Sequence, residues 1–207
     1  TAQNMKKNNI QCVRIGSVVE ESADCDNLID YSSLYRTELM DLYLIANCKF
    51  FVVSASGIML LATLYGKATV VHNLPFISFA GDMAMPLSPE RDIILMKKIW
   101  YKSENRYLTL RDILNIENKY KDKGYYLFDE YKKMGCEFIE NTPEEIWNAV
   151  NEMNQRLDGT ISYTDEELEA QKRYLHIVHT TTAKNKILFY NGMYSTNFLV
   201  NNPWFLK

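Results

Sequence analysis

Residues 36–73 read RTELMDLYLIANCKFFVVSASGIMLLATLYGKATVVHN, and this stretch decides the fold class. Between residues 37 and 47, apolar side chains recur three and four positions apart, which marks one face of a helix. They are Leu39, Leu42, Tyr43 and Ala46. Residues 50–53 are apolar throughout, as in a parallel strand covered on both faces, and residues 68–72 repeat this pattern after a second helical stretch at 58–65. The stretch therefore predicts a βαβ unit.

The turn at residues 54–57, Ser-Ala-Ser-Gly, joins the first strand of this unit to its helix. Ser54 or Ser56 is placed to cap the helix, whose first N–H groups point outward and attract phosphate. Gly57 allows a ligand to approach the backbone closely. Two interpretations are open: a phosphate-binding turn, or a capped helix with a tight turn and nothing bound.

The chain as a whole is predicted to be an α/β protein with a Rossmann-like, doubly wound parallel sheet and helices on both faces. The strands predicted for this sheet are residues 11–15, 50–53, 68–72 and 137–140, with a further short strand at 92–96. In this prediction residues 1–160 form a nucleotide-binding domain, and residues 161–207 form a helical C-terminal extension that packs back on it. Residues 18–35 are acidic and irregular, which indicates a functional or partly ordered loop.

Three threonines mark helix starts, and the helices they open run to about residues 116, 157 and 180. They are Thr109, Thr142 and Thr164. Thr142 gives the strongest signal because Glu145 completes a capping box. The last segment, residues 187–207, predicts a terminal helix and tail in which Trp204 and Phe205 are core or interface anchors.

Composition excludes some classes of partner. With 207 residues, 47% hydrophobic content and a net charge of -3, the chain is long enough for a core and carries no basic footprint for nucleic acid or an anionic membrane. No apolar run approaches the ~20 residues of a transmembrane helix. The four cysteines are scattered, which favours free thiols and a cytoplasmic protein. The chain opens at Thr1 with what reads as the tail of a helix, so we expect a preceding βα unit and a larger protein.

Loops at the carboxyl ends of parallel strands are where open α/β sheets bind ligands. Beyond the 54–57 turn, these loops contain Arg14, Gly16 and Asn73. Arg14 is expected either to neutralise a diphosphate or to pair with an acid among residues 20–30. Asn73 either binds a ligand or forms a local Asx turn.

The remaining chemistry-bearing residues give weak signals. His72 is more typical of a satisfied core histidine than of a catalyst. His176 and His179 lie three apart on a helix without the other ligands of a metal site, so we predict no metal and no cofactor. Since no nucleophile, carboxylate pair or His–acid dyad is visible, an enzyme function rests on resemblance to known proteins and on the phosphate-ready turn at 54–57.

Segments spread over nearly the whole chain form an ordered set: 13–16, 29–32, 40–44, 48–52, 56–57 and the closing Asn-Pro-Trp-Phe-Leu at 202–206. This set resembles the carboxyl-terminal half of bacterial GT-B glycosyltransferases of surface-polysaccharide biosynthesis. Residues 41–66 also resemble the donor-binding unit of GT-B fucosyltransferases, in which a helix acid binds the nucleotide base and a Ser-rich turn binds the phosphates. The resemblance implies base recognition by Asp41, which is otherwise read as a solvated helix acid.

The resemblance further implies transfer of a sugar from a nucleotide-sugar donor to a glycan or lipid-linked saccharide acceptor, without a metal. The donor-binding residues would be Arg14, Gly16, Asp41, Ser54, Ser56, Gly57 and Asn73. The amino-terminal half that supplies acceptor contacts in such enzymes is missing here, so this part by itself is expected to bind donor without turnover.

Two other functions compete with this one. The alternative is a non-catalytic nucleotide-binding or scaffolding module of a polysaccharide-assembly complex, which the residues alone do not distinguish from an enzyme. A nicotinamide-dependent oxidoreductase is disfavoured, because the 54–57 turn lacks the Gly-x-Gly-x-x-Gly pattern.

Overall fold

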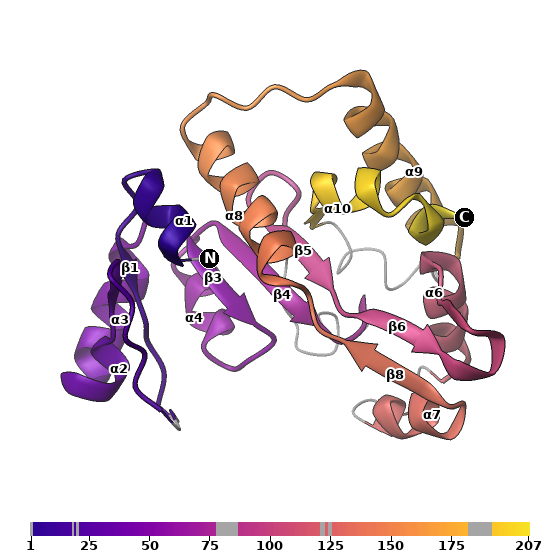
Figure 1. Ribbon diagram of the computed structural model, residues 1–207, viewed down its shortest axis with the longest axis horizontal. Coiled ribbons are helices and arrows are strands. Elements are labelled where there is room, and N and C mark those ends of the chain that lie inside the picture. The colour runs from indigo at the N-terminus through magenta and orange to yellow at the C-terminus, as the bar shows by residue number, and fades with distance from the viewer. Residues whose placement is uncertain are drawn as a thin grey trace.

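The computed structural model describes residues 2–17, 19, 21–77, 87–120, 123, 126–181 and 192–207. These residues form a mixed α/β fold (Figure 1), and its largest sheet is four-stranded and parallel, in the order β3-β4-β5-β9. The strands are β3 (Phe51–Ser54), β4 (Thr69–Leu74), β5 (Ile93–Met96) and β9 (Met193–Tyr194). The predicted parallel strands at 50–53 and 68–72, and the short strand at 92–96, are thus confirmed as neighbours.

The βαβ unit contains α3 (Glu38–Asn47) before β3, and α4 (Met59–Leu64) between β3 and β4. Thr37 caps α3 by accepting a hydrogen bond from the N–H of Met40 at 3.2 Å. The predicted packing face of this helix is wrong, because Leu39 and Tyr43 are 78% and 61% exposed. The buried residues are instead Asp41 and Ile45, which lie four positions apart on another face of the helix. The carboxylate of Asp41 forms an ion pair with Arg36 there.

Residues 11–15 do not join the main sheet, which corrects the prediction. Within the described residues, β1 (Cys12–Val13) pairs in parallel with β2 (Leu28–Ile29) in a separate two-stranded sheet. The apolar pair Leu28–Ile29 lies inside the segment that the acidic composition marked as a loop, and it provides the partner strand. The short helix α2 (Tyr31–Leu34) follows it, and α1 (Ala2–Lys7) precedes β1.

The prediction that residues 137–140 belong to the main parallel sheet is also wrong. β8 (Cys136–Ile139) runs antiparallel to β6 (Lys98–Tyr101), which also pairs antiparallel with β7 (Arg106–Tyr107). One residue separates β5 from β6, and the 3-10 turn η1 (Lys102–Glu104) joins β6 to β7. Along β8, Cys136 and Phe138 are more buried than Glu137 and Ile139. This alternation suits an antiparallel sheet with one solvated face, not a parallel strand buried on both faces.

The predicted helix starts are confirmed. The helices of the second half are α6 (Leu110–Lys119), α7 (Leu127–Lys133), α8 (Pro143–Leu157), α9 (Asp165–Thr181), α10 (Thr196–Asn201) and the 3-10 helix η4 (Pro203–Leu206). Thr109 and Thr142 each form a capping box, and Thr164 accepts from the N–H of Glu167 at 3.3 Å. Helix α8 packs across β4 and β5 (Figure 1).

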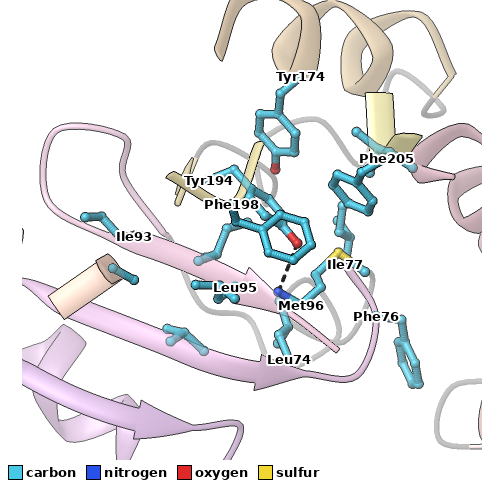
Figure 2. Close-up of a cluster of buried hydrophobic side chains, with 14 of the residues drawn as sticks. Leu74, Phe76, Ile77, Ile93, Leu95, Met96, Tyr174, Tyr194, Phe198 and Phe205 are labelled. Carbon is cyan, nitrogen blue, oxygen red and sulfur yellow. Dashed lines mark hydrogen bonds between the residues drawn. The ribbon is translucent and has the colours of Figure 1, made fainter. Parts of the chain in front are cut away.

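The C-terminal segment supplies a strand as well as helices. Strand β9 brings Tyr194 into the core, where its hydroxyl accepts a hydrogen bond from the N–H of Met96 at 3.2 Å (Figure 2). Tyr194 contacts the rings of Tyr174, Phe198 and Phe205. The extension predicted as helix and tail therefore completes the parallel sheet; residues 187–191 of the predicted segment lie outside the described residues.

Candidate functional site

The 54–57 turn lies at the carboxyl end of β3, beside the carboxyl end of β4. The parallel register places Ser54 opposite His72. Ser54 and Gly57 are exposed, and a Cβ built on Gly57 would meet no atom within 4 Å. The backbone of the turn therefore borders open space that a ligand can enter.

The turn does not cap α4 through a serine side chain, so that prediction is wrong. The residue before α4 is Ile58, which has helical φ and ψ angles of -66° and -21° and makes no side-chain cap. The carbonyl groups of Ser56 and Gly57 accept hydrogen bonds from the N–H groups of Met59 and Leu60, at 3.1 and 3.2 Å. The chain enters the helix through tight backbone turns, and the serine hydroxyls have no capping role.

Asn73 fixes the end of β4 to the start of α8. It has a left-handed φ of 51°, a conformation that Asn tolerates better than most residues. Its N–H donates to Oδ1 of Asn141 at 2.8 Å, and its own Oδ1 accepts from the N–H of Asn141 at 2.6 Å. Asn141 also donates from Nδ2 to the carbonyl of Met96 at 2.8 Å. This exchange ties β4, β5 and the segment before α8 together, and it replaces the local Asx turn that the sequence suggested.

His72 is half-buried beside this bridge. Its Nδ1 atom is buried without a hydrogen-bond partner in the described part of the chain, and burial lowers the pKa of the imidazole, against an opposing effect of Glu140. Glu140 is exposed and pairs with Lys97 at 3.1 Å. His72 is therefore not the satisfied core histidine that the sequence suggested, but a neutral ring next to the 54–57 turn.

Arg14 makes the intramolecular pair that was one of its two interpretations. Its Nη1 donates to the carbonyl of Glu21 at 2.8 Å and to Oδ2 of Asp30 at 3.3 Å. Hydrogen bonds from Ser32, from the N–H of Ala23 and from Ser33, together with the Arg14 charge, lower the pKa of Asp30 to about 2. The guanidinium of Arg14 thus neutralises Asp30, an acid of its own loop.

Asp41 lies in the first turn of α3 and is not a solvated helix acid. Its Oδ2 pairs with Nη2 of Arg36 at 3.0 Å, while its Oδ1 is buried without a hydrogen-bond partner among the described residues. A buried carboxylate oxygen without a donor costs free energy.

The predicted residues divide into two groups. Ser54, Ser56, Gly57 and Asn73 lie at the carboxyl ends of β3 and β4, together with His72. Arg14, Gly16 and Asp41 belong to the part formed by β1, α2 and α3, at the left end of the molecule in Figure 1. Gly16 has a φ of 154°, which side-chain-bearing residues rarely adopt. Sequence reasoning missed the contribution of Asn141, which comes from a segment 68 residues away from Asn73.

A further polar cluster lies between α8, α9 and α10, next to a hollow of about 140 Å³. The buried carboxylate of Glu152 accepts from the N–H and hydroxyl of Thr196, at 2.9 and 2.6 Å, and from the Tyr163 hydroxyl at 3.1 Å. Burial raises the pKa of Glu152 despite these bonds. Protein donors already serve both carboxylate oxygens, which indicates a structural role.

No model of a known protein family matches this chain, and the comparisons with curated proteins and with solved structures give no match either. In the part of the chain that the structure describes, no helix combines the length and apolar character needed to cross a membrane.

Proposed function

We propose that this chain is the donor-binding part of a glycosyltransferase, a Rossmann-like half of a GT-B fold that binds a nucleotide sugar for transfer to a glycan or lipid-linked acceptor. The observation that carries the proposal is the position of the 54–57 turn, at the carboxyl end of β3 in a parallel β3–α4–β4 unit. Ligands of open α/β sheets bind at such ends. The order of sequence segments that resembles the GT-B enzymes supports the same proposal.

The chemistry asks the site to hold a departing nucleoside diphosphate. Backbone N–H groups and hydroxyls aimed at phosphate oxygens can stabilise that charge without a metal. The exposed Ser54 and the open space at Gly57 allow such contacts. In this proposal the carboxylate of Asp41 accepts from the base or the ribose. Acceptor contacts and the remaining catalytic groups come from another part of the enzyme.

The proposal includes a cytoplasmic location, which the cysteines support. All four of them, Cys12, Cys25, Cys48 and Cys136, are free thiols. Free thiols persist in reducing compartments.

Binding of nucleotide sugars tests the proposal. A thermal-shift panel of UDP-glucose, GDP-mannose, GDP-fucose and the matching nucleosides should show stabilisation by at least one nucleotide sugar and none by its nucleoside, because ligands that bind the native state raise its stability by mass action. Absence of stabilisation by every nucleotide sugar at millimolar concentration would contradict the proposal.

The location of the phosphates is tested with Gly57→Val, which should weaken binding at least tenfold by filling the approach to the turn. The unliganded variant should melt close to the parent, because no atom lies within 4 Å of the new Cβ. Ser103→Val, at an exposed position in η1, is the matched control and should bind like the parent. Equal affinity of Gly57→Val and Ser103→Val would remove the turn from the site.

A further inference from the structure

His72 stands next to the turn that the proposed function assigns to the donor phosphates. In the β3–β4 register it is the residue opposite Ser54, so both lie at the carboxyl ends of neighbouring parallel strands. The Asn73–Asn141 exchange immediately after it holds the backbone at this point. The backbone of His72 is therefore held beside Ser54, where the turn begins.

The two ring nitrogens of His72 have different surroundings. Nδ1 is buried and has no hydrogen-bond partner among the described residues. Within the same part of the chain Nε2 has no hydrogen-bond partner either, but it is not buried as Nδ1 is. Burial lowers the pKa of the ring below its ordinary value, so the free protein holds the neutral form at pH 7.

The charged groups around β4 are compatible with a neutral His72 ring. Strands β3 and β5 and helix α4 contain no titratable side chain. Glu140, from the segment before α8, faces the ring and is paired with Lys97. The charged residues of α8, which packs on β4 and β5, are Glu144, Glu145 paired with Lys98, the buried Glu152, and Arg156. Lys97 and Lys98 are thus paired with acids, whereas Arg156 donates to the carbonyl groups of Pro89 and Glu90.

We infer that His72 is a phosphate-binding residue of the donor site: its imidazole takes up a proton from solvent as a nucleotide sugar binds and donates a hydrogen bond from Nε2 to a diphosphate oxygen. This inference rests on the proposed function, since the diphosphate is the anion that the 54–57 turn would hold. A nearby anion favours the charged imidazolium over the neutral ring. One proton enters per ring at most, and no bond of the ligand is broken.

The predicted consequence is binding that strengthens as the pH falls. Because binding raises the pKa of the ring, affinity increases below the pKa of the bound imidazole, by at most about tenfold per pH unit. Nucleotide sugars are suitable probes because each of their two phosphates has one ester bond and one anhydride bond, and so keeps one negative charge between pH 6 and pH 8. A free nucleoside diphosphate would titrate in this window and confuse the result, since its terminal phosphate has a pKa of about 6.

The experiment is calorimetric titration of UDP-glucose and GDP-mannose at pH 6.0 and 8.0, each in two buffers of different ionisation enthalpy, which gives the number of protons taken up. We expect at least threefold tighter binding at pH 6.0 and uptake of a substantial fraction of one proton near pH 6.5. His72→Gln keeps an N–H donor but cannot titrate, so it should abolish both the pH dependence and the proton uptake.

The sequence offers a matched control because it contains three histidines. His176 and His179 are exposed on α9, and the double variant His176→Gln/His179→Gln leaves His72 as the sole imidazole. This variant should keep the proton uptake, and its imidazole resonances, followed by NMR, should titrate at higher pH with UDP-glucose than without. The NMR readout does not depend on whether His72→Gln folds.

Two failures are distinguishable. If neither nucleotide sugar binds at either pH, the proposed function is contradicted along with the inference. If a nucleotide sugar binds but no proton is taken up, and the His72 resonances titrate alike with and without it, then the assignment of His72 is overturned while the donor site stands.

Discussion

Replacing Asn141 by Ala should destabilise the fold by about 2–4 kcal/mol, since two side-chain hydrogen bonds are lost and the Met96 carbonyl is left buried without a donor. The side chain accepts from the N–H of Asn73 and donates to the carbonyl of Met96, both at 2.8 Å. Met96 is fully buried, so water does not replace the lost donor. The backbone N–H of Asn141 keeps its bond to Asn73, which limits the loss.

Equilibrium urea unfolding measures this loss as a shift of the midpoint at unchanged slope. Asn201→Ala is the control, because that exposed Asn donates only to the carbonyl of Asn197 within its own helix, and the change should cost less than about 0.5 kcal/mol. Asn141→Asp should be worse at pH 7 than at pH 4, since a buried carboxylate would face the Met96 carbonyl without a donor. A parent-like midpoint for Asn141→Ala would refute the view that this bridge holds the end of β4.

Four further predictions concern charged groups. The pKa of Asp30 is about 2, so its stabilising hydrogen bonds are lost as the pH falls from about 4 to about 2. Over that pH range the urea midpoint of Asp30→Asn should therefore decrease less than that of the parent. The pKa of Glu152 is raised, so the ionised form is disfavoured in the native state. Glu152→Gln should therefore gain stability relative to the parent as the pH rises from 4 to 7. The same difference in unfolding free energy at pH 4 and pH 7 would contradict this. Arg36→Gln should cost more than Asp41→Asn, by about 1–3 kcal/mol, because it leaves a buried carboxylate unpaired; equal costs would refute the pairing argument. Asp41→Asn should also reduce a preference for guanine over uracil nucleotides in calorimetry if the acid reads the base, or weaken all nucleotides alike if it contacts the ribose. Unchanged binding of every nucleotide would remove Asp41 from the site.

Local signals predicted the elements of this fold well. The helical period, the apolar runs and the threonine caps act within a few residues, so α3, β3, α8 and α9 follow from the sequence. Sheet membership did not follow in the same way. The residues at 11–15 and 137–140 indicate that a strand forms, but its partner is chosen by contacts far along the chain. In β8, Glu137 stands between Cys136 and Phe138, and a charged residue at this position speaks against a strand buried on both faces.

The candidate site was predicted in part. The 54–57 turn and Asn73 are placed together because both follow parallel strands of one βαβ unit. The role of Asn141 is not readable from the sequence, since it depends on the chain returning to β4 after the antiparallel sheet. The surroundings of His72 and the inward turn of Asp41 likewise depend on packing, which residue type and periodicity do not determine.

The most direct test of the donor site is an NMR titration of the ¹⁵N-labelled chain with the nucleotide sugar that gives the largest thermal shift. Amide groups that bind phosphate change their environment strongly, so the resonances of Ser56, Gly57 and Ile58 should show the largest shifts and saturate with one ligand. Unchanged resonances at residues 54–58, with the shifts instead collected around Glu152 and Tyr163, would contradict a phosphate site at the end of β3.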